Sequence, residues 1–155
     1  MKINVCKAMV KENNFCVLST CKDNLTNSSL MLYLSDEEGT KLYMLTLIGS
    51  MKYTNMEENP EVSLLIDTRE HILDHEPTVK ALTVYGHSTI IHDEKLNREI
   101  IEKLVEKHPS LQALASMDKV TVVQVDVKSF LYLDGVNDAE YIMVRKNGEA
   151  DHRRI

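Results

Sequence analysis

The residues best suited to chemistry are a serine and a lysine at the expected start of a short helix. Ser50 is a natural N-cap for a helix over residues 51–58. Lys52 lies in the first turn, where acids are usual, whereas Glu57 and Glu58 close the last turn, where bases are usual. Free N–H groups at a helix start, a serine hydroxyl and a lysine together form a site for a phosphate. The alternative is a lysine that only points into solvent.

Strands are expected on both sides of this helix. The β-prone apolar run from Leu42 to Thr46 precedes it, and Val62 to Ile66 is extended again after Asn59-Pro60 has ended the helix. The strand–loop–helix–strand unit over residues 41–67 is the stretch around which we expect the chain to be organised.

Elsewhere, strand-like runs outnumber helical ones. In one of these runs Leu30, Leu32 and Leu34 alternate with Ser29, Met31 and Tyr33. Gly86 lies within another run and predicts a bulge or a close approach of two backbones. We expect strands at 15–21, 28–34, 78–91, 120–133 and 141–144, helices at 3–13 and after Asp93, and a frayed tail over 145–155. Without regular β–α alternation, this pattern predicts a mainly β protein, an antiparallel barrel decorated by helices, as one domain over residues 1–155.

Composition excludes several classes of function. The formal net charge of −6, from 24 acids against 18 bases, disfavours nucleic acid and anionic membranes as partners. No apolar run approaches the roughly 20 residues of a membrane span, and the first residues do not resemble a signal peptide, so we expect a cytoplasmic protein. Cys6, Cys16 and Cys21 match no metal or disulfide motif. His71 and His75 lack a third ligand of suitable spacing, so no metal site is expected.

No local motif identifies a nucleophile or a catalytic base. The sequence has no GxSxG, HExxH, P-loop or GxGxxG pattern. We interpret His87 as a partly exposed strand residue, because nothing nearby in the sequence orients it. The catalytic residues are therefore unknown, and if the protein is an enzyme, a cofactor is expected to carry the chemistry.

The segment 41–67 resembles the cofactor loop of the pyridoxamine 5′-phosphate oxidase-like family, the FMN-binding split β-barrels. In that family a strand ending in Thr leads to a Ser–basic–Lys turn, a short helix, Asn-Pro and a Val-rich strand. The corresponding residues here are Thr46, Ser50-Met51-Lys52, Asn59-Pro60 and Val62-Ser63-Leu64-Leu65. The likeness extends loosely from about Phe15 to Val127 and implies a Greek-key antiparallel split β-barrel.

The resemblance also implies a function, a cofactor and an assembly. It implies an FMN-dependent oxidoreductase or electron-transfer protein, a homodimer with the flavin at the subunit interface, and a small-molecule or protein electron donor. Lys52 would neutralise the phosphate, Ser50 would donate a hydrogen bond to it, and Thr46 would face the flavin end of the site. The cofactor-binding residues implied are Ser29, Leu30, Met31, Leu32, Leu45, Thr46, Ser50, Met51 and Lys52.

The sequence departs from the family at several positions. Met51 stands where many relatives have Arg, and Ala81 where flavin-contacting members often have Gln. The C-terminal Arg and His segment of true pyridoxamine phosphate oxidases is not reproduced, so vitamin B6 oxidation is not expected. Two alternatives stay open: a binding module on the same fold, for haem, deazaflavin or another small molecule, and a dimer without a cofactor. Candidate axial ligands for haem are His71, His75 and His87.

Overall fold

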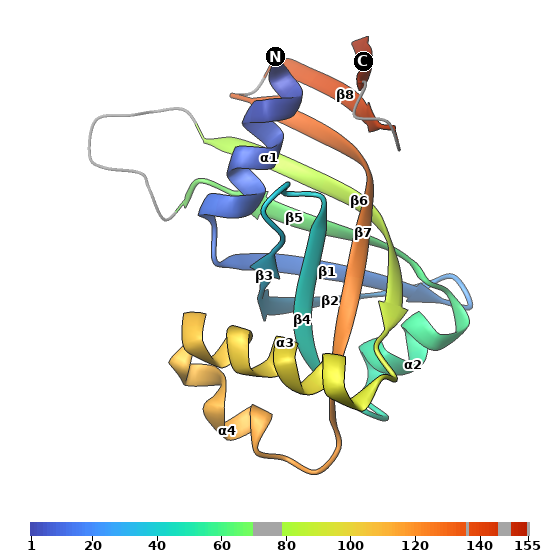
Figure 1. Ribbon diagram of the computed structural model, residues 1–155. Helices are drawn as coiled ribbons and strands as arrows, with labels where there is room; N and C mark the ends of the chain where they lie inside the picture. The colour runs from blue at the N-terminus through green and yellow to red at the C-terminus, as the bar shows by residue number, and fades with distance from the viewer. Residues whose placement is uncertain (70–78, 136, 146–149, 155) are drawn as a thin grey trace.

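The protein is a curled antiparallel sheet with helices at its two ends, seen in a computed structural model that describes residues 1–69, 79–135, 137–145 and 150–154 (Figure 1). The strands are β1 (Phe15–Lys22), β2 (Leu25–Leu32), β3 (Leu34–Ser35), β4 (Lys41–Leu47), β5 (Glu61–Asp67), β6 (Lys80–Ile90), β7 (Val120–Asp134), β8 (Asp138–Val144) and β9 (Ala150–Arg154). The helices are α1 (Lys2–Glu12), α2 (Met51–Glu58), α3 (Glu94–Lys107), the 3-10 helix η2 (Pro109–Leu111) and α4 (Gln112–Ala115).

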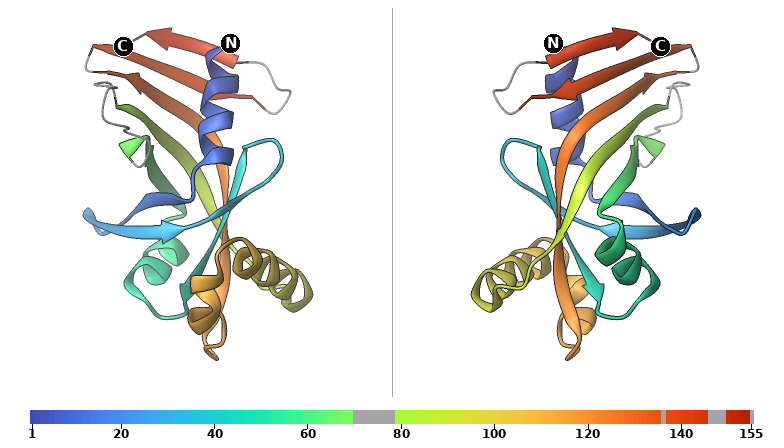
Figure 2. Two further views of the ribbon diagram at one scale, coloured as in Figure 1. Left: turned by 90° about the vertical axis from the view of Figure 1, so that its left-hand side faces the viewer. Right: turned by 90° about the vertical axis from the view of Figure 1, so that its right-hand side faces the viewer.

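The sheet follows the order β2-β1-β5-β6-β7-β4-β3, and β8 and β9 extend it from β7. It curls so strongly that the strands near its two ends, β2 and β4, come into contact (Figure 2). All its pairs are antiparallel. The antiparallel split β-barrel expected from the sequence is confirmed.

Two apolar clusters hold the elements together. The larger lies between the curled sheet and α1, where Cys6 and Val10 of the helix meet strand residues such as Leu18 and Phe130. The smaller cluster packs α3 on β4 and β7 through Ile100, Leu104, Leu45, Val122 and Ile91. Asp93 caps α3 as expected, because its Oδ1 accepts the N–H of Leu96 at 2.8 Å.

The bulge expected at Gly86 is present. The pairing of β6 with β7 shifts register between Tyr85 and Gly86. A Cβ at Gly86 would lie 2.5 Å from Cγ1 of Val125 and 2.9 Å from the carbonyl oxygen of Asp126, so only glycine fits. The close approach lets β6 and β7 stay paired along almost their whole length while the sheet bends.

The strand expected over 28–34 is wrong in its extent, and the structure shows which of its faces is buried. β2 already begins at Leu25 and ends at Leu32, and the chain then crosses to β3 through Tyr33. Leu30 is 71% exposed, whereas Tyr33 is fully buried. Both faces of this strand carry large apolar side chains, so alternation alone did not show which of them joins the core.

Hydrogen bonds explain why Tyr33 is drawn inward. Its hydroxyl donates to the carbonyl of Val10 at 2.7 Å, its N–H donates to the carbonyl of Asn14 at 3.1 Å, and its own carbonyl accepts from Nε2 of His108 at 2.8 Å. The Val10 carbonyl lies in the last turn of α1, where helix carbonyls lack an intrahelical partner. Tyr33 therefore joins α1, the start of β1 and the end of α3.

The C-terminal region differs from expectation. The sequence predicts a frayed tail over 145–155, but Ala150–Arg154 form β9, which pairs with β8. The reason is that β8, paired with β7 on one side, offers a second edge of unpaired backbone groups. His71 and His75 lie outside the described residues.

Within the part of the chain that the structure describes, no helix is long and apolar enough to cross a membrane. The same residues contain no group of three or more His, Cys, Asp or Glu side chains placed to hold a metal ion.

Candidate functional site

A pocket lies where the two ends of the curled sheet meet, and we call it the split pocket. Its volume is about 310 Å³. The residues that line it are Phe15 of β1, Leu30, Met31 and Leu32 of β2, Leu45, Thr46 and Leu47 of β4, Lys52 of α2, Leu111 of η2 and Leu114 of α4. The lining is apolar except for one hydroxyl and one ammonium group.

The polar edge of the split pocket is fixed by the capping of α2. Ser50 Oγ accepts the N–H of Tyr53 at 3.4 Å and shares a hydrogen bond of 3.2 Å with Thr46 Oγ1. Gly49, with φ of +85°, makes the tight turn between β4 and α2. The end of the strand and the start of the helix are therefore held together, and the N-cap expected at Ser50 is confirmed.

The ammonium group of Lys52 has no ion-pair or hydrogen-bond partner among the described residues. Lys52 is half-buried at the split pocket, and none of the ion pairs or hydrogen bonds of the described chain involves its side chain. The backbone N–H groups of Met51 and Lys52 make no hydrogen bond to another described residue either. A cation and two free amides thus gather at one helix start without an acid in that turn.

The structure brings six of the nine predicted cofactor residues together in the split pocket: Leu30, Met31, Leu32, Leu45, Thr46 and Lys52. Ser50 lies directly behind them through its hydrogen bond to Thr46. Ser29 and Met51 do not line the pocket: Oγ of Ser29 accepts a hydrogen bond from Asn27, and Met51 is 66% exposed. The roles of all nine toward a ligand stay predictions.

Sequence reasoning missed four residues of the lining. Phe15 falls in the strand expected over 15–21, and Leu47 extends the run expected from Leu42 to Thr46 by one residue, but nothing in their spacing marked them as facing a pocket. Leu111 and Leu114 come from the short helical turns η2 and α4 that follow α3. Two half-buried leucines at i and i+3 on such a short segment were the available signal, because they indicate an apolar face that must cover something.

His87 belongs to a different place, a surface cluster with Glu61 and Lys128. Its Nδ1 lies 3.2 Å from Glu61 Oε1, and Lys128 Nζ lies 2.7 Å from Glu61 Oε2. Hydrogen bonds from Lys128 and His87 hold the pKa of the Glu61 carboxyl below its usual value. The partner that orients His87 is 26 residues away in sequence, which is why local reading missed it. His87 does not line the split pocket.

Comparison with known proteins gives one family and a set of similar structures. The sequence profile of the family described as pyridoxamine 5′-phosphate oxidase matches residues 4–134. No curated protein matches the sequence significantly.

Three solved structures illustrate the likeness. A putative pyridoxamine 5′-phosphate oxidase from Listeria innocua is 19% identical, with a TM-score of 0.66 over 86% of this chain and 98% of that one. A FAD-binding protein from Mesorhizobium loti is 17% identical, with a TM-score of 0.68 over 86% and 94%. HutZ, a heme storage protein from Vibrio cholerae, is 19% identical, with a TM-score of 0.65 over 80% and 88%. At these identities the likeness establishes the fold.

Proposed function

The chain belongs to the pyridoxamine 5′-phosphate oxidase family, and from that membership we propose that it is an FMN-binding flavoprotein with its cofactor in the split pocket. The observation that carries the proposal is that the cation and the free N–H groups at the N-terminus of α2 lie beside an apolar wall. Lys52 and the amides of Met51 and Lys52 have no partner among the described residues, and they lie next to leucines from β2, β4, η2 and α4. The phosphate of FMN matches the cation and the N–H groups, and its flat ring system matches the leucines.

Each part of the pocket has a role in this proposal. Lys52 acts as a point charge for the phosphate, and the two amides donate hydrogen bonds to it. Ser50 serves by capping the helix and by holding the Thr46 hydroxyl through a hydrogen bond. The ring packs on Leu30, Leu32, Leu45, Leu111 and Leu114, which also exclude water from one of its faces. A bound flavin supplies hydride or electron transfer, with a small molecule or a protein as donor.

A second copy of the chain would complete the site. Members of this family are commonly dimers. The volume of the split pocket is at the lower end of the range for ligand sites, about 300–1,000 Å³, so one copy offers only part of an enclosure. Large apolar side chains are exposed on the outward face of the sheet beside it: Phe15 at 40%, Leu30 at 71%, Leu65 at 39% and Tyr85 at 39%. Such a face is typical of a protein interface, so we propose a homodimer with the flavin between the subunits.

Haem is the second candidate, and the structural likeness to HutZ favours it. The described histidines do not supply an axial ligand in the split pocket. His87 lies in the surface cluster with Glu61, and His108 donates its Nε2 proton to the carbonyl of Tyr33. Flavin therefore fits the described residues better.

The absorption spectrum of the purified protein, repeated on the supernatant after heat denaturation, tests the proposal. Twin flavin bands that are released on heating and match FMN by chromatography would support it. A Soret band would refute FMN and identify haem as the bound cofactor. A colourless protein that takes up no added FMN would refute flavin binding and leave a binding module for another molecule.

A further inference from the structure

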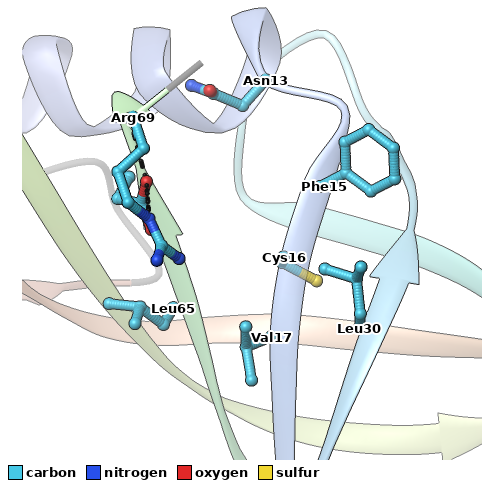
Figure 3. A pocket seen from close by; sticks show the side chains of 8 residues that line it. Asn13, Phe15, Cys16, Val17, Leu30, Leu65 and Arg69 are labelled. Carbon is cyan, nitrogen blue, oxygen red and sulfur yellow. Dashed lines mark hydrogen bonds and ion pairs between the residues drawn. The ribbon is translucent and has the colours of Figure 1, made fainter. Parts of the chain in front are cut away.

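A second pocket lies beside the split pocket on the outward face of the sheet, and we call it the Arg69 pocket (Figure 3). Its volume is about 260 Å³. It is lined by Asn13, Phe15, Cys16, Val17, Leu30, Leu65, Asp67 and Arg69. Phe15 and Leu30 line both pockets, so the two spaces share a wall.

The floor of the Arg69 pocket is a row of apolar side chains across three strands. The register pairs Leu30 of β2 with Val17 of β1, and Val17 with Leu65 of β5. Residues in register on neighbouring strands point to the same face of a sheet, so these three side chains lie in line. In Figure 3 they lie below the centre of the pocket, with Phe15 to one side.

The guanidinium group of Arg69 lies above this floor, and hydrogen bonds to Asp67 hold it in place. Arg69 Nε donates to Asp67 Oδ1 at 2.9 Å, and the backbone N–H of Arg69 donates to the same oxygen at 2.9 Å. The Asp67 side chain is only 16% exposed. Burial by itself raises the pKa of this carboxyl, but the hydrogen bonds from Arg69 outweigh it and bring the pKa below its usual value. Asp67 is therefore ionised at neutral pH and clamps the guanidinium at Nε.

The clamp leaves the other edge of the guanidinium without a partner among the described residues. The two terminal nitrogens make no hydrogen bond to another described residue, and Figure 3 shows that end of Arg69 turned toward the middle of the pocket, near Leu65. Two parallel N–H donors at this edge match the two oxygens of a carboxylate. The apolar floor provides a surface for a hydrocarbon body attached to it.

We propose that the Arg69 pocket binds a small organic carboxylate with an apolar body, the carboxylate on the free edge of Arg69 and the body on Val17, Leu30 and Leu65. Because the wall of Phe15 and Leu30 is shared, such an acid would lie next to a ligand in the split pocket. Phe15, Leu30 and Leu65 also belong to the face proposed for the homodimer, so in the dimer the acid would be enclosed between the two subunits. In that respect the inference rests on the proposed function and names the class of its substrate. Binding of the acid itself does not require the flavin.

The test is a pair of nuclear magnetic resonance titrations of the flavin-free full chain at pH 7, with phenylacetate and with the neutral phenylacetamide as probes. We expect phenylacetate to shift the amide signals of Val17, Leu65 and Arg69, and to bind about three- to tenfold more tightly than phenylacetamide. The factor is modest because the Arg69 side chain is 69% exposed and its charge is screened.

Variants make the test specific for the free guanidinium edge. Arg69→Gln should abolish the preference for phenylacetate, and Arg69→Lys should retain part of it, since the charge stays but the paired donors are lost. Arg98→Gln is the matched control, because Arg98 is an exposed arginine of α3 far along the chain from the pocket. Equal affinity for the two probes, no shift at the pocket residues, or an equal effect of Arg98→Gln would overturn the proposal.

The failure of this proposal and the failure of flavin binding are distinguishable. Lys52→Ala should leave phenylacetate affinity unchanged, because Lys52 lines only the split pocket. Phenylacetate binding by a protein that takes up no FMN would support the Arg69 pocket and refute the flavin. FMN uptake by a protein that does not discriminate between the two probes would refute the Arg69 pocket alone.

Discussion

Replacing Lys52 by alanine is the most direct perturbation of the split pocket. The side chain is half-buried, and no described residue forms an ion pair or hydrogen bond with it, so its removal breaks no polar contact of the described chain. Ser50 keeps its capping bond to Tyr53 in the variant, which preserves the start of α2. A change in ligand affinity can therefore be assigned to the missing ammonium group.

The size of the effect follows from the chemistry of the contact. A hydrogen bond to a charged group contributes about 1.5–3 kcal/mol, and every 1.4 kcal/mol is a factor of ten in affinity. Lys52→Ala should therefore weaken FMN binding by about ten- to 150-fold. The lower end is expected, because Lys52 is only half-buried and water screens part of its charge.

Quenching of FMN fluorescence on titration with protein, at constant low ionic strength, measures the affinity. Riboflavin, which lacks the phosphate, serves as the internal reference and should bind the wild type and Lys52→Ala equally. Lys95→Ala, on the exposed face of α3, is the control for loss of a positive charge elsewhere. If FMN affinity were unchanged, or if riboflavin affinity fell by the same factor, Lys52 would not hold the phosphate.

Three further predictions concern the scaffold. Tyr33→Phe should lower the free energy of unfolding by about 1–3 kcal/mol in urea titrations, because the buried carbonyl of Val10 loses its donor. Tyr43→Phe is the control and should change the free energy of unfolding little, because the Tyr43 hydroxyl makes no described hydrogen bond. Gly86→Ala should cost at least about 1–3 kcal/mol in the same measurement, since the added methyl group meets Val125, and a neutral outcome would contradict the close approach of β6 and β7. Stability should also fall in alkaline solution. Burial raises the pKa of Cys6, Cys16 and Tyr132 to about 12, so the folded chain holds these protons more tightly than the unfolded chain. The resulting stabilisation is complete below the ordinary pKa values of 9 to 10 and is lost as the pH rises through 12. Urea midpoints at pH 8 and pH 11 measure this loss of stability, and Cys16→Ala should make the loss smaller.

Local chemistry made the unit over residues 41–67 predictable. The N-cap at Ser50, the end of α2 before Pro60 and the two flanking strands depend on neighbours within a few residues, and the structure contains all of them. Gly86 was predictable for the same reason, because a glycine within a strand pattern typically marks a bulge or a close approach of two backbones.

The rest of the site depends on contacts that cross the chain. Leu30 faces outward because Tyr33 is held inward by Val10 and His108, which lie 23 and 75 residues away. Leu111 reaches the split pocket only because α3 packs on β4 and β7. Neither fact leaves a signal in the spacing of the residues concerned, so the pattern could supply the elements but not the direction in which they face.

The order of strands in the sheet also has a consequence for synthesis of the protein. Every residue that lines the split pocket lies between positions 15 and 114, yet β4 joins β6 and the rest of the sheet through β7, which begins at Val120. A nascent chain that has not yet delivered β7 therefore contains the whole set of lining residues with its two halves apart. We expect such a chain to be unable to bind a ligand, and to leave the apolar edges of β4 and β6 open to chaperones, or to a second nascent chain, until that last long strand emerges from the ribosome.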